Sequence, residues 1–192
     1  LLALLCAKQA QTVTMSEWLS YAQKQQTENM VALTFDDGFL DTYTEAFPLL
    51  QKYQMKATIY LSPHFEAINR MQPEHLQIMQ QSGLIEFGAH TMTHPNLNNI
   101  SDEQAMQEIM DSKQWVEKHI GYCHCFAYPF GRFSEKHMHM VEKAGFCCAV
   151  STKKRILAFS ANNQFCLPRI SISGLMDSVQ LRIALRVGRY RL

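Results

Sequence analysis

Two pairs of polar residues in this chain could support hydrolytic chemistry. The first pair, Asp36 and Asp37, stands before Gly38 and directly after the apolar run Met30–Phe35. Adjacent carboxylates repel each other unless a cation or a proton joins them. Neighbouring side chains also point in different directions, so one carboxylate can bind a metal while the other faces a substrate. The same Asp-Asp-Gly sequence is also compatible with a helix-capping turn.

The second pair is His90 and His94, which follow the apolar segment Leu84–Phe87. Neutral imidazoles suit zinc and similar ions. No Glu stands next to His90, so the pair is not the H-E-x-x-H protease motif. The residue order typical of a non-haem iron oxygenase is also absent. One carboxylate with two histidines makes an open three-ligand site, which is typical of a catalytic metal.

A third segment, Ala127–Gly131, contains Pro129 and Gly131, which can shape a turn that presents a backbone N–H. The alternative is an ordinary loop after a strand. Cys123-His124-Cys125 resembles a metal motif but lacks the second cysteine pair of structural zinc sites. On a strand the two cysteines share one face, and we interpret them as buried thiols.

These residues must be positioned by alternating strands and helices. Apolar runs predict five strands, with a possible sixth over Arg169–Ser173, and helical spacing predicts four helices between them. Pro48 should split the first of these helices. Alternation of this kind favours a parallel sheet, open or closed into a barrel, in which function gathers after the carboxyl ends of the strands. The predicted strands are Met30–Phe35, Ala57–Leu61, Leu84–Phe87, His124–Tyr128 and Phe146–Val150, and the helices are Asp41–Tyr53, Pro73–Ser82, Ser101–Ile120 and Ser134–Ala144.

Composition fits one packed domain over residues 1–192, because 47% of residues are hydrophobic and 18% are charged. A formal net charge of +1 gives no electrostatic case for nucleic acid. No apolar run reaches the roughly 18–20 residues of a membrane span. The apolar start, Leu1–Ala7, favours an amphipathic core helix over the end of a signal segment with a lipidated Cys6.

Three motifs in this order resemble the polysaccharide deacetylase family, also known as the NodB homology domain or carbohydrate esterase family 4. Thr34–Gly38 matches the family's T-F-D-D-G motif, and His90–His94 matches its H-[ST]-x-x-H motif. Phe126–Gly131 is similar to the form found in the poly-N-acetylglucosamine deacetylase branch, and Leu167–Ile170 resembles a later segment. The resemblance covers roughly residues 12–173.

The resemblance implies an α/β fold of the distorted or incomplete (β/α) barrel type. It implies a divalent metal, most often Zn²⁺ with Co²⁺ or Ni²⁺ as alternatives, held by Asp37, His90 and His94. Asp36 would be the general base, and the backbone N–H of Phe130 would stabilise the oxyanion. The implied reaction removes N-acetyl groups from an N-acetylated polysaccharide and gives acetate and a free amine. An extracytoplasmic location follows from such a substrate.

The chain departs from the family pattern at two points. The third motif lacks its usual Arg, and Arg169 is our candidate replacement by position, with a surface ion pair as the alternative. The usual C-terminal histidine acid is also missing, since no His follows His139. His64 is a candidate acid, and an ordinary loop residue is the alternative.

These departures keep two other functions open: a weakly catalytic metal- and glycan-binding module, and a metal amidase for a small amide. Because barrels of this kind have about 250 residues, we also expect the chain to be truncated at its N-terminus.

Overall fold

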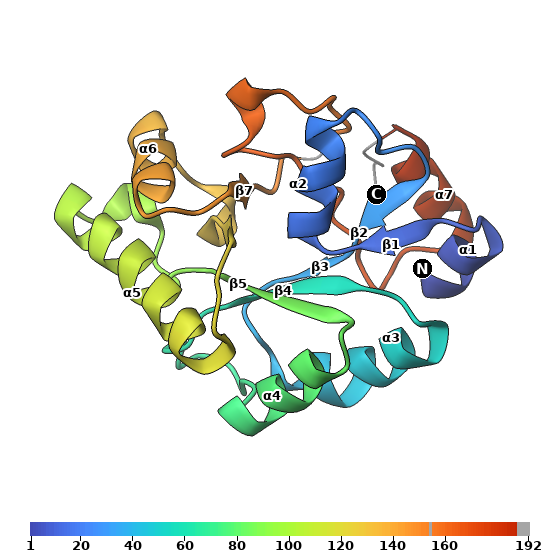
Figure 1. Cartoon of the computed structure of the whole chain (residues 1–192), viewed down its shortest axis with the longest axis horizontal. Coiled ribbons are helices and arrows are strands. Elements are labelled where there is room, and N and C mark those ends of the chain that lie inside the picture. The colour runs from blue at the N-terminus through green and yellow to red at the C-terminus, as the bar shows by residue number, and fades with distance from the viewer. Residues whose placement is uncertain (154, 188–192) are drawn as a thin grey trace.

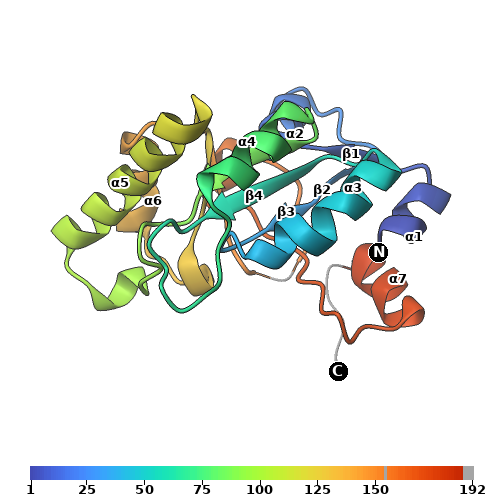
Figure 2. The same ribbon diagram turned by 90° about the horizontal axis from the view of Figure 1, so that it is seen from below.

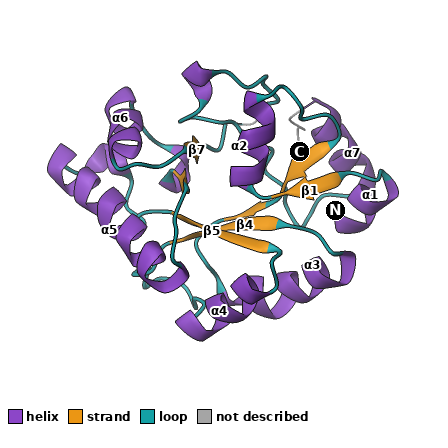
Figure 3. Cartoon of the chain, in the orientation of Figure 1, coloured by secondary structure: helices purple, strands orange, loops and turns teal. Residues whose placement is uncertain are grey.

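The structure of the protein is a computed structural model that describes residues 1–153 and 155–187. Strands and helices alternate along it (Figures 1 and 3). The strands are β1 (Gln11–Val13), β2 (Met30–Ala32), β3 (Thr34–Phe35), β4 (Ala57–Leu61), β5 (Ile85–Ala89), β6 (Cys125–Ala127) and β7 (Cys148–Val150). The α-helices are α1 (Leu2–Ala7), α2 (Met15–Gln23), α3 (Phe47–Tyr53), α4 (Pro73–Gln81), α5 (Asp102–Ile120), α6 (Glu135–Lys143) and α7 (Ser178–Val187).

The main sheet is parallel and has the strand order β3-β4-β5-β6-β7. A separate parallel pair, β1-β2, leads into it. The sheet curls into a half-barrel with helices around it (Figure 1). This confirms the predicted α/β fold of the distorted (β/α) barrel type.

The two faces of the sheet bury different cores. The outer face packs against α3, α4, α5 and α6, and its fully buried residues include Leu50, Ile59 and Phe87. The inner face is smaller and is covered by α2, which contributes Met15 and Leu19. Figures 1 and 2 show α2 on the side of the sheet opposite α3 and α4. Helix α2 therefore fills the concave side of the half-barrel.

Three predicted strands, corresponding to β5, β6 and β7, differ from the structure by one or two residues at their ends, and two others are wrong in more than their bounds. Met30–Phe35 is interrupted at Leu33, because β2 pairs with β1 whereas β3 pairs with β4. Arg169–Ser173 forms no strand, and the nearest pairing is an isolated bridge between Val150 and Leu167. Pro168 has no N–H to donate to a ladder, and Ser171–Ser173 are exposed, so this segment has no face to bury.

The predicted helices are confirmed to within one or two residues, apart from the start of the first. Its first half is a π-helical turn, Thr42–Ala46, and α3 follows with Pro48 in its first turn, where a missing N–H costs nothing. Ser101 caps α5 by accepting a hydrogen bond from the Gln104 N–H, and Gly121 ends it with a φ of +95°. The apolar start of the chain is helical, as expected, and buries Leu5.

The cysteine prediction is partly wrong. Cys123 and Cys125 are both buried thiols, but Cys123 packs in the outer core and Cys125 in the inner core. The reason is that β6 begins only at Cys125, so strand alternation does not extend back to Cys123. No helix among the described residues is both long enough and apolar enough to cross a membrane.

Candidate active site

The candidate residues gather at one edge of the half-barrel. Asp36 and Asp37 follow β3, His90 and His94 follow β5, and Phe130 follows β6. Because all strands of the main sheet are parallel, their carboxyl ends share an edge. The structure therefore brings together side chains that lie far apart in the sequence.

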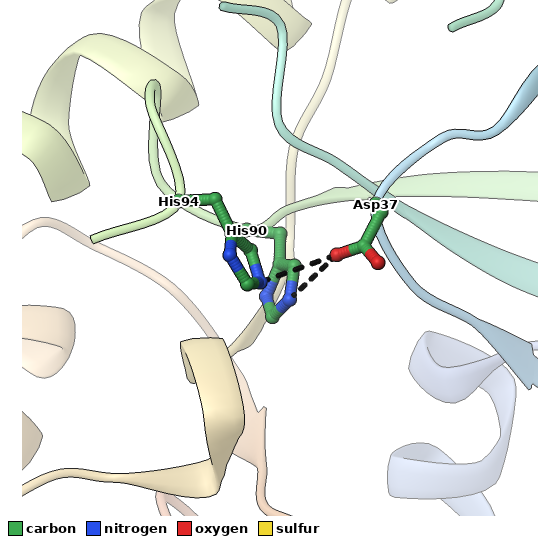
Figure 4. Close-up of side chains that lie close together, drawn as sticks. All are labelled: Asp37, His90 and His94. Atoms are coloured by element: carbon green, nitrogen blue, oxygen red, sulfur yellow. Dashed lines mark ion pairs between the residues drawn. The ribbon is translucent and has the colours of Figure 1, made fainter. Parts of the chain in front are cut away.

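Asp37, His90 and His94, which we call the triad, converge on one point (Figure 4). The Asp37 Oδ1 atom lies 3.3 Å from Nε2 of His90 and 3.2 Å from Nε2 of His94. The three potential ligand atoms all lie within 4.8 Å of one another. Within the described part of the chain, the buried Asp37 Oδ1 accepts no hydrogen bond. One carboxylate oxygen and two imidazole nitrogens suit a zinc-like divalent ion and leave a coordination position open, so the residues fit the implied metal.

The two histidines are oriented in different ways. Nδ1 of His90 lies 2.7 Å from the Ala127 carbonyl oxygen, a contact that places the proton on Nδ1 and leaves Nε2 free to bind. Nδ1 of His94 is buried and has no partner among the described residues. Instead, the His94 ring stacks on Phe65 at 4.6 Å between centroids and meets Phe130 edge-on at 4.6 Å.

Burial lowers the pKa of His94, and the neighbouring His90 lowers it further, against the opposing effect of Asp37 and Asp36. The neutral imidazole is the form that binds metals. The packing of the site therefore favours the protonation state that a metal ligand needs.

The backbone at this edge is strained. Asp37, Thr91, His94 and Phe130 all have φ values between +58° and +72°, a region that residues other than glycine rarely adopt. Thr91 is both β-branched and fully buried, which makes its conformation the least expected of the four. Strain of this kind persists only where the surroundings enforce it, and it clusters at functional sites.

Asp36 forms a bidentate pair with Arg169. Nη1 and Nη2 of Arg169 donate to the two carboxylate oxygens, each at 2.7 Å. Burial pushes the Asp36 pKa upward, but the charge and hydrogen bonds of Arg169 outweigh it, so the pKa lies below its ordinary value. Asp36 is therefore ionised at neutral pH and able to accept a proton.

Arg169 is itself held by several groups. It donates to Thr34 Oγ1 at 3.1 Å and to the Ser151 carbonyl at 3.2 Å. Its guanidinium lies 5.7 Å from the centre of the Tyr60 ring. The structure thus places Arg169 beside Asp36, although they are far apart in the sequence.

Phe130 occupies the short turn Pro129–Gly131 after β6. The residue is 57% exposed, and its backbone N–H has no hydrogen-bond acceptor among the residues described. The Phe130 ring contacts His94, so this N–H lies on a turn that borders the triad. A free backbone donor in such a position can stabilise a developing negative charge.

A cleft runs beside the triad along the loop that follows β4. It has a volume of about 240 Å³, and its lining includes Asp37, His64 and Arg70. A second hollow of about 610 Å³ shares His64 and Arg70 and extends to Glu66 and Thr93. The His64 N–H donates to the Met92 carbonyl at 2.8 Å, which ties this loop to the loop of the two histidines.

Sequence reasoning missed Phe65 and Tyr60. Phe65 is one aromatic residue in a loop, and Tyr60 belongs to an apolar strand, so neither carries a local signal. The ring of Tyr60 occupies the space beside Gly88, where an added Cβ would lie 2.7 Å from it. Gly88 belongs to β5 but lies one residue beyond the predicted strand Leu84–Phe87, so the close packing that a glycine in a strand suggests was not expected there.

Comparisons with known proteins show which sequences and structures this chain is similar to. The family model described as polysaccharide deacetylase matches residues 23–149. YxkH of Bacillus subtilis (strain 168) is 32% identical over 152 residues, which cover 78% of this chain and 54% of that protein. The poly-beta-1,6-N-acetyl-D-glucosamine N-deacetylase of Staphylococcus aureus (strain MRSA252) is 27% identical over 180 residues, covering 85% of this chain and 62% of that protein.

Among solved structures, the Streptococcus pyogenes deacetylase PplD in complex with acetate is similar, with a TM-score of 0.83 and 27% sequence identity. The match covers 93% of this chain and 80% of PplD. The chain spans 54% and 62% of the lengths of the two curated relatives above.

Proposed function

The chain belongs to the polysaccharide deacetylase family, and from this premise we propose that it removes N-acetyl groups from an N-acetylglucosamine-containing polysaccharide. The family predicted from the sequence motifs is confirmed, as is the similarity to poly-N-acetylglucosamine deacetylases. The observation that carries the proposal is the juxtaposition of an Asp37–His90–His94 triad with an Arg169-paired Asp36.

In the proposed reaction, water attacks the acetamide carbonyl, the C–N bond breaks, and acetate and a sugar amine are released. Asp37, His90 and His94 would hold a divalent metal, with Zn²⁺ as our first choice. Such an ion supplies Lewis acidity, which brings the pKa of a water to about 7 and polarises the amide carbonyl.

Asp36 takes the proton from the attacking water. Arg169 keeps this carboxylate ionised and fixes both of its oxygens, so the base is oriented before substrate arrives. The N–H of Phe130 donates to the negative charge that develops on the carbonyl oxygen as water adds to the carbonyl carbon. The departing amine needs a proton, and we propose His64, which lines the cleft with Asp37, as its source.

The shape of the cleft favours a polymer over a small amide. The two hollows share His64 and Arg70 and together extend along the loop after β4, past the metal-binding loop. Small-molecule sites usually enclose most of their ligand, whereas this arrangement leaves room for neighbouring sugars. A substrate of the exopolysaccharide or biofilm type would place the protein outside the cytoplasm, and this location is part of the proposal.

The test is acetate release from defined N-acetylglucosamine oligomers, with and without a chelator. We expect Asp36→Asn to bind metal normally but to lose acetate release by about 100-fold or more, because a general base contributes about 10²–10⁴-fold. His90→Ala should lose both metal and activity. His64→Gln in the same assay examines the proposed acid.

Two outcomes would contradict the proposal. Full activity of Asp36→Asn would exclude Asp36 as the base. Oligomer binding by the metal-loaded protein without any acetate release would instead favour a glycan-binding module. Glu28→Ala is a suitable control, because Glu28 is exposed and lies outside the cleft.

A further inference from the structure

The loop that carries both histidines contains a turn with a strained backbone, which contacts from its surroundings must stabilise. Thr91 has a φ of +64° and is fully buried, and His94 has a φ of +60°. Within the loop, Thr91 Oγ1 accepts a hydrogen bond from the His94 N–H at 3.2 Å. This bond links the start of the loop to its end but leaves Met92 and Thr93 to be held from outside.

Glu108 of helix α5 supplies that support. Its Oε2 atom accepts hydrogen bonds from the backbone N–H groups of Met92 at 2.8 Å and Thr93 at 2.9 Å. Its Oε1 atom accepts a third, from Thr93 Oγ1 at 2.7 Å. Both carboxylate oxygens are thus used on two of the three residues between the histidines, Met92 and Thr93.

An ordinary surface acid would look different. Glu108 is half-buried and forms no ion pair within residues 1–153 and 155–187. Its charge is therefore directed at the donors of the loop, which are charge-assisted partners. It does not belong to the group of potential metal ligands, which contains Asp37, His90 and His94.

We propose that Glu108 is a positioning residue, which holds the Met92–Thr93 turn and thereby fixes His94 relative to His90 and Asp37. The inference rests on the proposed metal-dependent function. Groups that orient metal ligands typically change metal affinity by about 10- to 100-fold when removed. Helix α5 would in this way raise the metal affinity of a site to which it contributes no ligand.

The test measures metal affinity, independently of catalysis, in the full chain. Zn²⁺ is titrated in competition with a chromophoric chelator, and Co²⁺ is added as a spectroscopic probe of coordination geometry. We expect Glu108→Ala to weaken Zn²⁺ binding about 10- to 100-fold and to alter the Co²⁺ spectrum. Glu108→Gln should fall between this variant and the wild type, because one amide oxygen can still accept while the amide nitrogen cannot.

Glu117→Gln is the matched control, since Glu117 is a half-buried carboxylate on the same helix that pairs with Lys113 instead. It should bind metal as the wild type does. If Glu108→Ala does not fold, Glu108→Gln carries the test, with the melting temperature of the metal-free protein as the check on folding.

The possible failures are distinguishable. A folded Glu108→Gln protein with wild-type affinity and an unchanged Co²⁺ spectrum would overturn the inference. A wild-type protein that binds Zn²⁺ tightly but releases no acetate would overturn the proposed function and leave the positioning role of Glu108 intact.

Discussion

Asp36 and Asp37 are adjacent, yet the structure gives them different surroundings. Asp37 faces two imidazole nitrogens, whereas Asp36 faces a guanidinium. The positive φ of Asp37 (+72°) turns the chain between them and separates the two carboxylates. One turn therefore supplies both a proposed metal ligand and a proposed base.

Arg169 is the residue that holds Asp36 in place. We expect Arg169→Ala to lose about 100-fold in kcat, because the proposed base loses the group that orients it. Arg169→Lys should retain part of the activity, since an ammonium keeps the charge but cannot form the bidentate pair. Acetate release by the zinc-loaded proteins is the measurement.

Added guanidinium ion distinguishes positioning from a general loss of folding. It should restore part of the activity of Arg169→Ala by filling the vacated space, and should have no such effect on Asp36→Asn. Wild-type kcat in Arg169→Ala would refute the role assigned to this residue and leave the Asp36 contact as an ordinary ion pair.

The residue scale also shows where sequence reasoning ends. Asp36, Asp37, His90 and His94 stand in short motifs at the ends of apolar runs, so local order reveals them. Arg169 was proposed by position alone, and its contact with Asp36 depends on how far the sheet curls. Phe65 and Glu108 contact the loop of the two histidines through packing and through hydrogen bonds to backbone groups, and such contacts leave no pattern in the sequence.

Among the elements, helix α2 has a role that its sequence does not suggest. Its N-terminal Ser16 donates to the buried Glu86 carboxylate through both its backbone N–H, at 3.1 Å, and its hydroxyl. Thr58 of β4 donates to the same carboxylate at 2.8 Å. Glu86 thus joins α2 to two strands on the concave side of the half-barrel, where a helix N-terminus favours a negative charge.

We expect Glu86→Ala to destabilise the fold by about 3 kcal/mol or more, because three donors lose their acceptor and each buried unsatisfied group costs about 1–3 kcal/mol. Urea unfolding followed by circular dichroism measures this change. Glu28→Ala, at an exposed position, should stay within about 0.5 kcal/mol of the wild type. Equal stability of the two variants would show that α2 is held by its apolar contacts alone.

Among the predicted strands, only β4 has the predicted bounds, although β5, β6 and β7 are equally buried. Ala57–Leu61 is buried at every position, and its short apolar run with β-branched residues is typical of a strand with both faces covered. Met30–Phe35 is predicted as one strand, but its two halves belong to different sheets. The break between them depends on the partners, since β2 pairs with β1 and β3 pairs with β4. The predicted strand at Arg169–Ser173 is wrong because pairing with the edge strand β7 stops at Leu167, before Pro168, and Ser171–Ser173 are exposed.

In the whole molecule, the proposed metal site spans β4. Asp37 follows β3 and the histidines follow β5, and these strands lie on either side of β4 in the sheet. The three side chains meet only when all three strands are paired and curled. A metal held by this triad would therefore bind the native state in preference to the unfolded chain and would stabilise the entire half-barrel.

This argument gives a prediction for thermal unfolding. Zn²⁺ at about 100 times its Kd should add about 2.7 kcal/mol of stability, which corresponds to a rise in Tm of about 5–10 °C for a chain of this size. A chelator should reverse the rise. His90→Ala should show almost no metal-dependent shift, whereas His139→Ala, on the exposed surface of α6, should shift like the wild type. Differential scanning fluorimetry with and without metal measures all three proteins, and an equal shift in His90→Ala and the wild type would place the metal elsewhere in the molecule.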